Sequence, residues 1–304
     1  MSARFSPESV LGTTLPSASG AYRLDQLLKS GGLAHVYLAA RVDAAGGLLA
    51  VKLMRPEVEG KPEVVARFER EALAASLVRH QNVIRVNEPV QHHRGLAYFA
   101  CEHLVGVDLA DQMASERKLA PERAIKIALG AALGLAAAHE KGIVHRDVKP
   151  ENIFLVHAPD GREVPRVIDF GSAWLASDSF EQRSTDSPTS GRARPMRITQ
   201  TTSFVGTPGY VAPEQAEGAV GHPAADVYAL GVVLYEALAG RPPFTAKTWM
   251  DLLVQHAHKP VPPLTGVSAA LQGVVALSLA KAPADRIPSM TDFHRELSAV
   301  PEAR

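Results

Sequence analysis

The chain has 304 residues, of which 46% are apolar and 21% charged, an ordinary globular composition that allows two domains or lobes. Basic and acidic residues number 32 each, so no global basic surface indicates a nucleic acid or an anionic membrane as partner. Cys101 is the single cysteine, which excludes an intrachain disulfide and favours a reducing cytoplasm. No apolar run reaches the roughly 20 residues that span a bilayer, so no transmembrane segment is expected.

The first twenty residues contain Pro, Ser, Thr and Gly without an apolar core behind a basic start. This composition does not indicate a signal peptide. We expect residues 1–20 to be a flexible N-terminal leader.

Residues 22–41 alternate apolar and polar side chains on either side of Gly31 and Gly32, which predicts two strands joined by a tight turn. A glycine-rich hairpin can lay its backbone amides over phosphates, because no Cβ obstructs the approach. Taken alone, the same residues also fit an ordinary β-turn.

A short apolar strand over residues 48–54 carries one ammonium group, Lys52. This lysine could simply extend to solvent. In the helix predicted over residues 61–79, however, Glu71 falls on the apolar face, where an unpaired carboxylate is costly. We therefore expect Lys52 and Glu71 to form an ion pair.

Periodicity predicts the remaining elements. Strands over residues 83–88 and 96–101 would complete a five-stranded antiparallel sheet with one helix. After residue 106 the pattern is mainly helical, and it predicts a long helix over 122–141, a hairpin from 153–156 and 166–168, and a fully buried helix over 226–236.

Residues 143–152, Ile-Val-His-Arg-Asp-Val-Lys-Pro-Glu-Asn, combine groups suited to moving a phosphoryl group onto a hydroxyl. Asp147 could accept the hydroxyl proton, Lys149 could face the phosphoryl charge, and Asn152 could offer a hard oxygen to Mg²⁺. The alternative is a polar turn, since Lys-Pro disfavours helix and Asp or Asn often bond local amides.

Other motifs accompany this stretch in a fixed order: Val51-Lys52 before it, then Asp169-Phe170-Gly171, then Gly206-Thr207-Pro208-Gly209-Tyr210 running into Ala212-Pro213-Glu214. From about Tyr22 to the C-terminus the chain resembles eukaryotic-type protein kinases, and bacterial serine/threonine kinases in particular. The resemblance implies a bilobal α+β fold. A small antiparallel sheet lobe with one helix would span residues 21–104, and a larger, mainly helical lobe residues 105–304.

The resemblance also implies site residues. The catalytic residues would be Asp147 and Lys149, and the metal ligands Asn152 and Asp169, holding Mg²⁺ with Mn²⁺ as an alternative. ATP would be bound by Lys29, Gly31, Gly32, Ala34, Val36, Ala50, Lys52, Glu71, Glu102 and Leu104. Lys29 and Ala34 stand where the family has glycines, which puts the strength of ATP binding in doubt. Cys101 falls at the gatekeeper position, where we expect it to act as a small packing residue.

Three further contacts are implied. Asp226 would hold the backbone of His145 and Arg146, Arg286 would pair with Glu214, and Thr207 would bond Asp147 and Lys149. The histidines lack a convincing set of metal partners, and we expect them at the surface or in the core.

An unusually long segment, about residues 175–203, is rich in Ser, Thr, Pro and Arg and has few apolar anchors, so disorder is expected. In bacterial kinases of this kind, the threonines matching Thr199 and Thr201 are autophosphorylated. A phosphate there could bond Arg146. Autophosphorylation would bring two copies of the chain together transiently.

The expected function is transfer of the γ-phosphoryl group of ATP to Ser or Thr of proteins in the cytoplasm. A pseudokinase that binds ATP or acts as a scaffold is the first alternative, supported by the poor glycine loop. A small-molecule kinase of related fold is the second. The segment from Gly206 to Glu214 and its Arg286 partner weigh against that reading.

Overall fold

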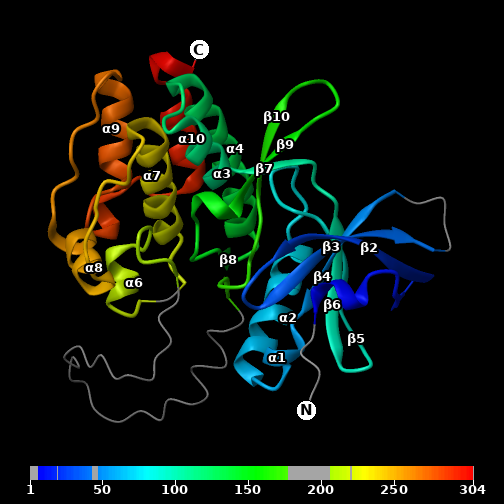
Figure 1. The fold of residues 1–304 in the computed structure, drawn as a ribbon. Coiled ribbons are helices and arrows are strands. Elements are labelled where there is room, and N and C mark those ends of the chain that lie inside the picture. Colours follow the sequence, from blue (N-terminus) through cyan, green and yellow to red (C-terminus); the bar gives the residue numbers. More distant parts are fainter. Residues whose placement is uncertain (1–5, 19, 43–46, 177–205, 220, 304) are drawn as a thin grey trace, which may run out of the picture. The chain divides into compact units, whose positions relative to one another are not determined.

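The computed structural model describes residues 6–18, 20–42, 47–176, 206–219 and 221–303 (Figure 1). The chain divides into two compact units. The first contains Met1–Val105 together with Asp169–Gly171, and the second contains Gly106–Ile168 together with Ser172–Arg304. The boundary expected after residue 104 thus lies one residue early, and residues 169–171 associate with the first unit.

The first unit is built on a six-stranded antiparallel sheet in the order β1-β2-β3-β4-β6-β5. Its strands are β1 (Thr14–Ser17), β2 (Gly20–Ser30), β3 (Ala34–Arg41), β4 (Leu49–Met54), β5 (Val86–His93) and β6 (Leu96–Glu102). Its helices are η1 (Pro7–Val10), α1 (Pro56–Glu59) and α2 (Pro62–Leu77). The expected hairpin around Gly31 and Gly32 is the connection between β2 and β3.

Each face of this sheet has its own apolar cluster, because side chains alternate along a strand. The inner cluster packs α2 against β3, β4 and β6 and comprises Ala34, Met54, Phe68, Ala72, Ala97 and Phe99. The outer cluster comprises Val10, Leu15, Tyr22, Leu24, Tyr37, Ala39, Val51, Leu53, Tyr98 and Ala100. Both faces are therefore covered.

Residues 7–17, here called the N-terminal strap, cover the outer face of the sheet. We expected a flexible leader here and a five-stranded sheet, but the strap forms η1 and adds β1 as a sixth strand beside β2. Its Val10 and Leu15 side chains are buried. The tyrosines of the outer face need cover and hydroxyl partners, and the strap supplies both.

The second unit is mainly helical. Its helices are α3 (Leu109–Glu116), α4 (Pro121–Glu140), η2 (Pro150–Asn152), α6 (Pro213–Ala216), α7 (Ala224–Ala239), α8 (Trp249–His258), α9 (Ala269–Ser278), η3 (Pro283–Asp285), α10 (Met290–Ser298) and η4 (Pro301–Ala303). Its strands are β7 (Gly106–Asp108), β8 (Ile143–Val144), β9 (Ile153–His157), β10 (Glu163–Val167) and β11 (Trp174–Leu175). They pair in the orders β10-β9-β7 and β11-β8.

The helix ends follow local chemistry. Helices α2 and α4 both begin with proline at the first helical position, where the missing N–H costs nothing. Helices α3, α8, α9 and α10 are each capped by a side chain that accepts a hydrogen bond from a backbone N–H of the first turn. The accepting residues are Asp108, Thr248, Ser268 and Ser289 respectively. Helix α4 is followed by Gly142 in a left-handed conformation, which stops it just before residues 143–152.

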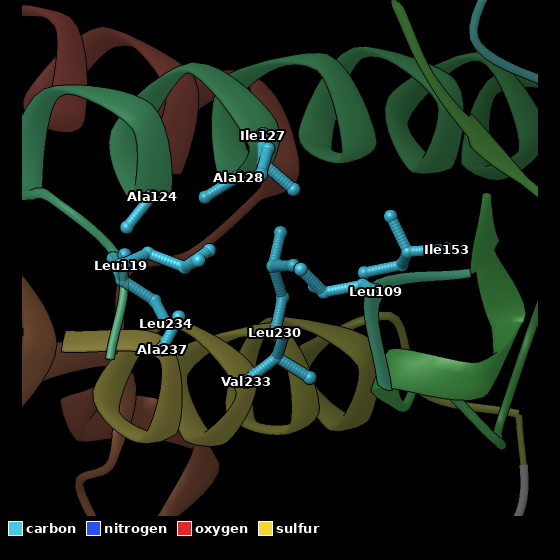
Figure 2. A pocket seen from close by; sticks show the side chains of 10 residues that line it. All are labelled: Leu109, Leu119, Ala124, Ile127, Ala128, Ile153, Leu230, Val233, Leu234 and Ala237. Atoms are coloured by element: carbon cyan, nitrogen blue, oxygen red, sulfur yellow. The ribbon is translucent and has the colours of Figure 1, made fainter. Parts of the chain in front are cut away.

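Helix α7 is buried on almost every side, as its apolar sequence predicted. It packs against α4, and a small cavity of about 10 Å³ remains between the two helices (Figure 2). Leu230 of α7 and Leu109 at the start of α3 point into this space. All its lining side chains are apolar, so we expect the cavity to be dry.

Candidate functional site

The first unit holds the predicted ion pair between Lys52 of β4 and Glu71 of α2. Lys52 Nζ lies 2.5 Å from Glu71 Oε1, and the side chains are only 22% and 12% exposed. Burial alone would lower the pKa of Lys52, but the carboxylates of Glu71 and Asp169 outweigh it and raise that pKa. Lys52 is therefore a fixed cation inside the unit.

A pocket of about 320 Å³ adjoins this pair. It is lined by Gly31, Gly32, Leu33, Ala34, Lys52, Met54, Val64, Arg67, Phe68, Glu71 and Asp169. The tip of the β2–β3 hairpin and the Lys52–Glu71 pair thus border one space, and the backbone amides of the hairpin can serve an anion there.

Asp169 lines the pocket with its backbone held in the left-handed region, at φ 61°. Its Oδ1 accepts a hydrogen bond from the Gly171 amide at 3.1 Å, which fixes the carboxylate. For a non-glycine residue this conformation is strained, and such strain is concentrated at functional sites.

Sequence reasoning missed Arg67, which lines the same pocket from α2. It lies close to Gly171, since a Cβ added to that glycine would come within 3.2 Å of Arg67 Nε. The helical spacing in the sequence indicates this position, because Arg67 precedes Glu71 by four residues and so lies on the same face of α2.

Val36, Ala50 and Cys101 share the inner sheet face with Lys52. The register pairs Val36 with Lys52 and Ala50 with Cys101. Cys101 is buried, its Sγ lies 3.5 Å from the Ala50 carbonyl, and burial raises its pKa to about 12. The thiol therefore acts as a packing group.

The other expected nucleotide residues of the first unit lie at the ends of strands. Lys29 pairs with Val36 near the end of β2 and is exposed. Glu102 ends β6, where its Oε1 accepts the Arg85 amide at 2.7 Å. Leu104 follows β6 by two residues and is partly buried.

In the second unit, Asp147, Lys149 and Thr207 form a closed triangle of hydrogen bonds. Lys149 Nζ donates to Asp147 Oδ2 and to Thr207 Oγ1, each at 2.9 Å. Thr207 Oγ1 donates to Asp147 Oδ1 at 2.8 Å. The predicted bonds of Thr207 are present, and Thr207 and Lys149 together hold both oxygens of the Asp147 carboxylate.

Asn152 lies in η2, at the end of the stretch 143–152, and is buried. Its Nδ2 donates to the Asp147 carbonyl at 2.8 Å. This bond orients the carboxamide, whose oxygen is the atom suited to a divalent cation.

Asp226, fully buried at the start of α7, holds the backbone of His145 and Arg146 as expected. Its carboxylate accepts the amides of His145 and Arg146, each at 2.8 Å. Sequence reasoning missed a third partner, His139 at the end of α4, whose Nε2 lies 2.8 Å from Asp226 Oδ2. Burial would raise the pKa of Asp226, but the bonds with His139 and the amides lower it.

The predicted pair between Arg286 and Glu214 is also present. The guanidinium makes two parallel bonds to the carboxylate, at 2.5 and 2.6 Å, and Arg286 is fully buried. It links α6 to the segment before α10.

Comparison of the sequence with known protein families agrees with this geometry. The protein kinase domain family matches residues 22–296. The chain belongs to this family. Its fold is therefore the expected bilobal kinase fold, in which the first unit is the sheet lobe and the second the helical lobe.

Bacterial serine/threonine-protein kinases are similar to this kinase domain. PknB of Mycobacterium tuberculosis is 34% identical over 295 residues, covering 95% of this chain and 44% of PknB. Pkn1 of Myxococcus xanthus is 36% identical over 282 residues, covering 91% and 38%. PkaB of Streptomyces coelicolor is 37% identical over 270 residues, covering 88% and 60%. The chain thus spans between about two fifths and three fifths of these relatives.

The regulatory residues are only partly described. Arg146 adopts φ 67°, and its carbonyl accepts a bond from Gln215 Nε2 at 3.2 Å. Thr199 and Thr201 lie outside the described residues, as does most of the expected insert. Among the residues that the structure describes, no helix is long and apolar enough to cross a membrane.

Proposed function

We propose that this kinase domain transfers the γ-phosphoryl group of ATP to serine and threonine hydroxyls of proteins. Asp147 accepts the proton of the attacking hydroxyl, and Lys149 stabilises the negative charge of the phosphoryl group as it moves. Thr207 bonds both side chains and so holds them in their relative positions. The similar bacterial proteins are serine/threonine-protein kinases, which supports the choice of serine and threonine.

The observation that carries this proposal is the triangle of Asp147, Lys149 and Thr207. A base and a cation held within 2.9 Å of each other by a third group are preorganised for proton and phosphoryl transfer. A polar turn of purely structural role would not require a buried carboxylate beside an ammonium.

The nucleotide half of the proposal rests on the first unit. Lys52 binds the phosphates, the hairpin from Gly31 to Ala34 covers them, and Val36 and Ala50 face the adenine, whose edge meets the backbone at Glu102 and Leu104. Asn152 and Asp169 each carry a hard oxygen of the kind that Mg²⁺ or Mn²⁺ prefers, so each is a proposed ligand for a divalent cation. The cation would neutralise phosphate charge when bound.

A cytoplasmic location is part of the proposal, because the single buried cysteine fits a reducing compartment. A pseudokinase remains the rival class. It is disfavoured because Lys52, Glu71, Asp147, Asn152 and Asp169 are all present. Lys52 pairs with Glu71, and Asp147 is bonded by Lys149 and Asn152.

The test is a phosphotransfer assay with γ-labelled ATP, Mg²⁺ and a generic basic protein, followed by phosphoamino-acid analysis. We expect label on serine or threonine, and a loss of about 10²-fold or more in Lys52→Met, because one electrostatic stabiliser is removed. ATP binding without any transfer by the wild type would instead establish the pseudokinase reading.

Regulation by autophosphorylation at Thr199 or Thr201 is a separate part of the proposal. A phosphate there adds about −1.5 to −2 charges and could bond Arg146, which precedes the catalytic base. Mass spectrometry after incubation with Mg-ATP should find phosphate on one of these threonines in the wild type but not in Asp147→Asn. Full activity of a variant with both threonines changed to alanine would contradict this regulation.

A further inference from the structure

The N-terminal strap is tied to the outer sheet face by two tyrosine hydroxyls. Tyr37 Oη donates to the Pro7 carbonyl at 2.9 Å, and Tyr98 Oη donates to the Pro16 carbonyl at 2.7 Å. Figure 1 shows the strap in dark blue against the sheet. Both tyrosines are almost fully buried, so the strap is part of the packed unit.

His35 lies where this outer face meets the β2–β3 hairpin. It is 2% exposed, and its ring meets the Tyr37 ring edge-on, with centroids 6.3 Å apart. Its Nδ1 lies 3.0 Å from Ser30 Oγ. Ser30 and His35 are the last paired residues of β2 and β3 before the turn. A continuous series of contacts therefore runs from Pro7 through Tyr37 and His35 to Ser30.

The other side of the same turn borders the pocket beside Lys52. Gly31 and Ala34 line that pocket, and the Gly31 amide donates to the Ala34 carbonyl at 2.9 Å to close the turn. The hairpin thus has a strap side, where Ser30 and His35 bond, and a pocket side.

The charges around His35 favour a neutral imidazole. Burial and the nearby Arg55 lower its pKa, while Glu57 and Glu8 of η1 act in the opposite direction more weakly. The bond between Ser30 and His35 therefore joins two neutral groups, a buried imidazole and an exposed hydroxyl at the end of β2.

We propose that His35 is a positioning residue for the nucleotide-covering hairpin and that the N-terminal strap holds it in place through Tyr37. This inference rests on the proposed function. A hairpin that is already fixed loses less conformational entropy when a triphosphate binds. The arrangement would compensate for the two glycines of the family pattern that Lys29 and Ala34 replace.

Four variants test the inference. His35→Phe keeps the ring but removes the bond to Ser30, and Ser30→Ala removes the same bond from the other side. Tyr37→Phe removes the strap anchor next to His35. Tyr98→Phe is the matched control, because it removes an equivalent hydroxyl bond to the strap at a position with no ring contact to His35.

The first measurement is the Kd and KM for ATP. The first three variants should weaken ATP binding about fivefold, the scale of one hydrogen bond, with kcat nearly unchanged. Tyr98→Phe should bind ATP like the wild type. A wild-type Kd in both His35→Phe and Ser30→Ala would overturn the inference.

The second measurement, amide hydrogen exchange of residues 30–35 without nucleotide, does not depend on kinase activity. Exchange should accelerate in His35→Phe, Ser30→Ala and Tyr37→Phe but not in Tyr98→Phe. If wild-type protein bound no ATP, the proposed function would fail, whereas this exchange pattern would still report on the positioning. Equal exchange in all variants would contradict the positioning role. If His35→Phe does not fold, the exchange rate of Ser30→Ala tests the same hydrogen bond.

Discussion

Cys101 places a small side chain at the proposed adenine site, between the Ala50 carbonyl and the end of β6. A ligand with an added hydrophobic group behind the adenine should therefore bind. Cys101→Phe should weaken binding of that ligand about tenfold or more, because the inserted ring would occupy the space that the added group needs. ATP turnover should change little.

The measurement is the Kd of an adenine analogue that carries an extra aromatic group, together with kcat for ATP. Cys101→Ala is the control and should retain the analogue. Equal affinity of the analogue for the wild type and Cys101→Phe would show that no such space exists beside Cys101.

At the scale of residues, the sequence predicted contacts whose partners share a motif or a helix face. Lys52 and Glu71 pair because a carboxylate on an apolar helix face needs a cation nearby. His139 was not predicted as the partner of Asp226, because 87 positions separate the two residues and no local pattern joins them.

At the scale of elements, the start of α7 fixes the stretch 143–152 through the bonds of Asp226 to two backbone amides. Asp226→Asn should remove at least one of the acceptor bonds to the amides of His145 and Arg146. We expect kcat to fall about tenfold or more and the free energy of unfolding to fall by about 1–3 kcal/mol. The Kd for ATP should remain unchanged, because Lys52 and its pocket belong to the other unit.

Turnover, ATP binding and urea unfolding separate these effects. His139→Gln serves as the control, because both amide bonds to Asp226 remain. Wild-type kcat in Asp226→Asn would contradict the organising role of α7.

Helices α2, α4 and α7 were predicted within two or three residues, because proline at the first position and apolar periodicity are local signals. Strand β1 was not predicted. Its residues Thr-Leu-Pro-Ser read as a loop, and proline is tolerated there only because β1 lies at the edge of the sheet. The bonds that fix the strap come from Tyr37 and Tyr98, far along the chain.

For the whole molecule, His256 makes stability depend on pH. It is buried in α8, with Nδ1 2.8 Å from Tyr228 Oη. Burial and the nearby Lys281 lower its pKa to about 4 from an ordinary 6.5. The unfolded chain therefore binds more protons between these values, so this contribution is complete above about pH 6.5 and is lost as pH falls towards 4.

Between pH 7 and pH 5 the contribution of His256 should fall by about 2 kcal/mol. Urea unfolding at both values should show a smaller pH dependence in His256→Asn, which keeps an acceptor near Tyr228. His258→Asn, an exposed histidine on the same helix, should behave like the wild type. An unchanged pH dependence in His256→Asn would contradict the buried neutral imidazole.

The central claim is that Asp147 is the base for phosphoryl transfer, held by Lys149 and Thr207. The most direct test measures kcat and the Kd for Mg-ATP in the wild type and Asp147→Asn. We expect kcat to fall about 10²-fold or more in Asp147→Asn, the scale of general-base catalysis, while nucleotide binding stays nearly intact. Equal turnover in the two proteins would contradict the role of Asp147 as the base.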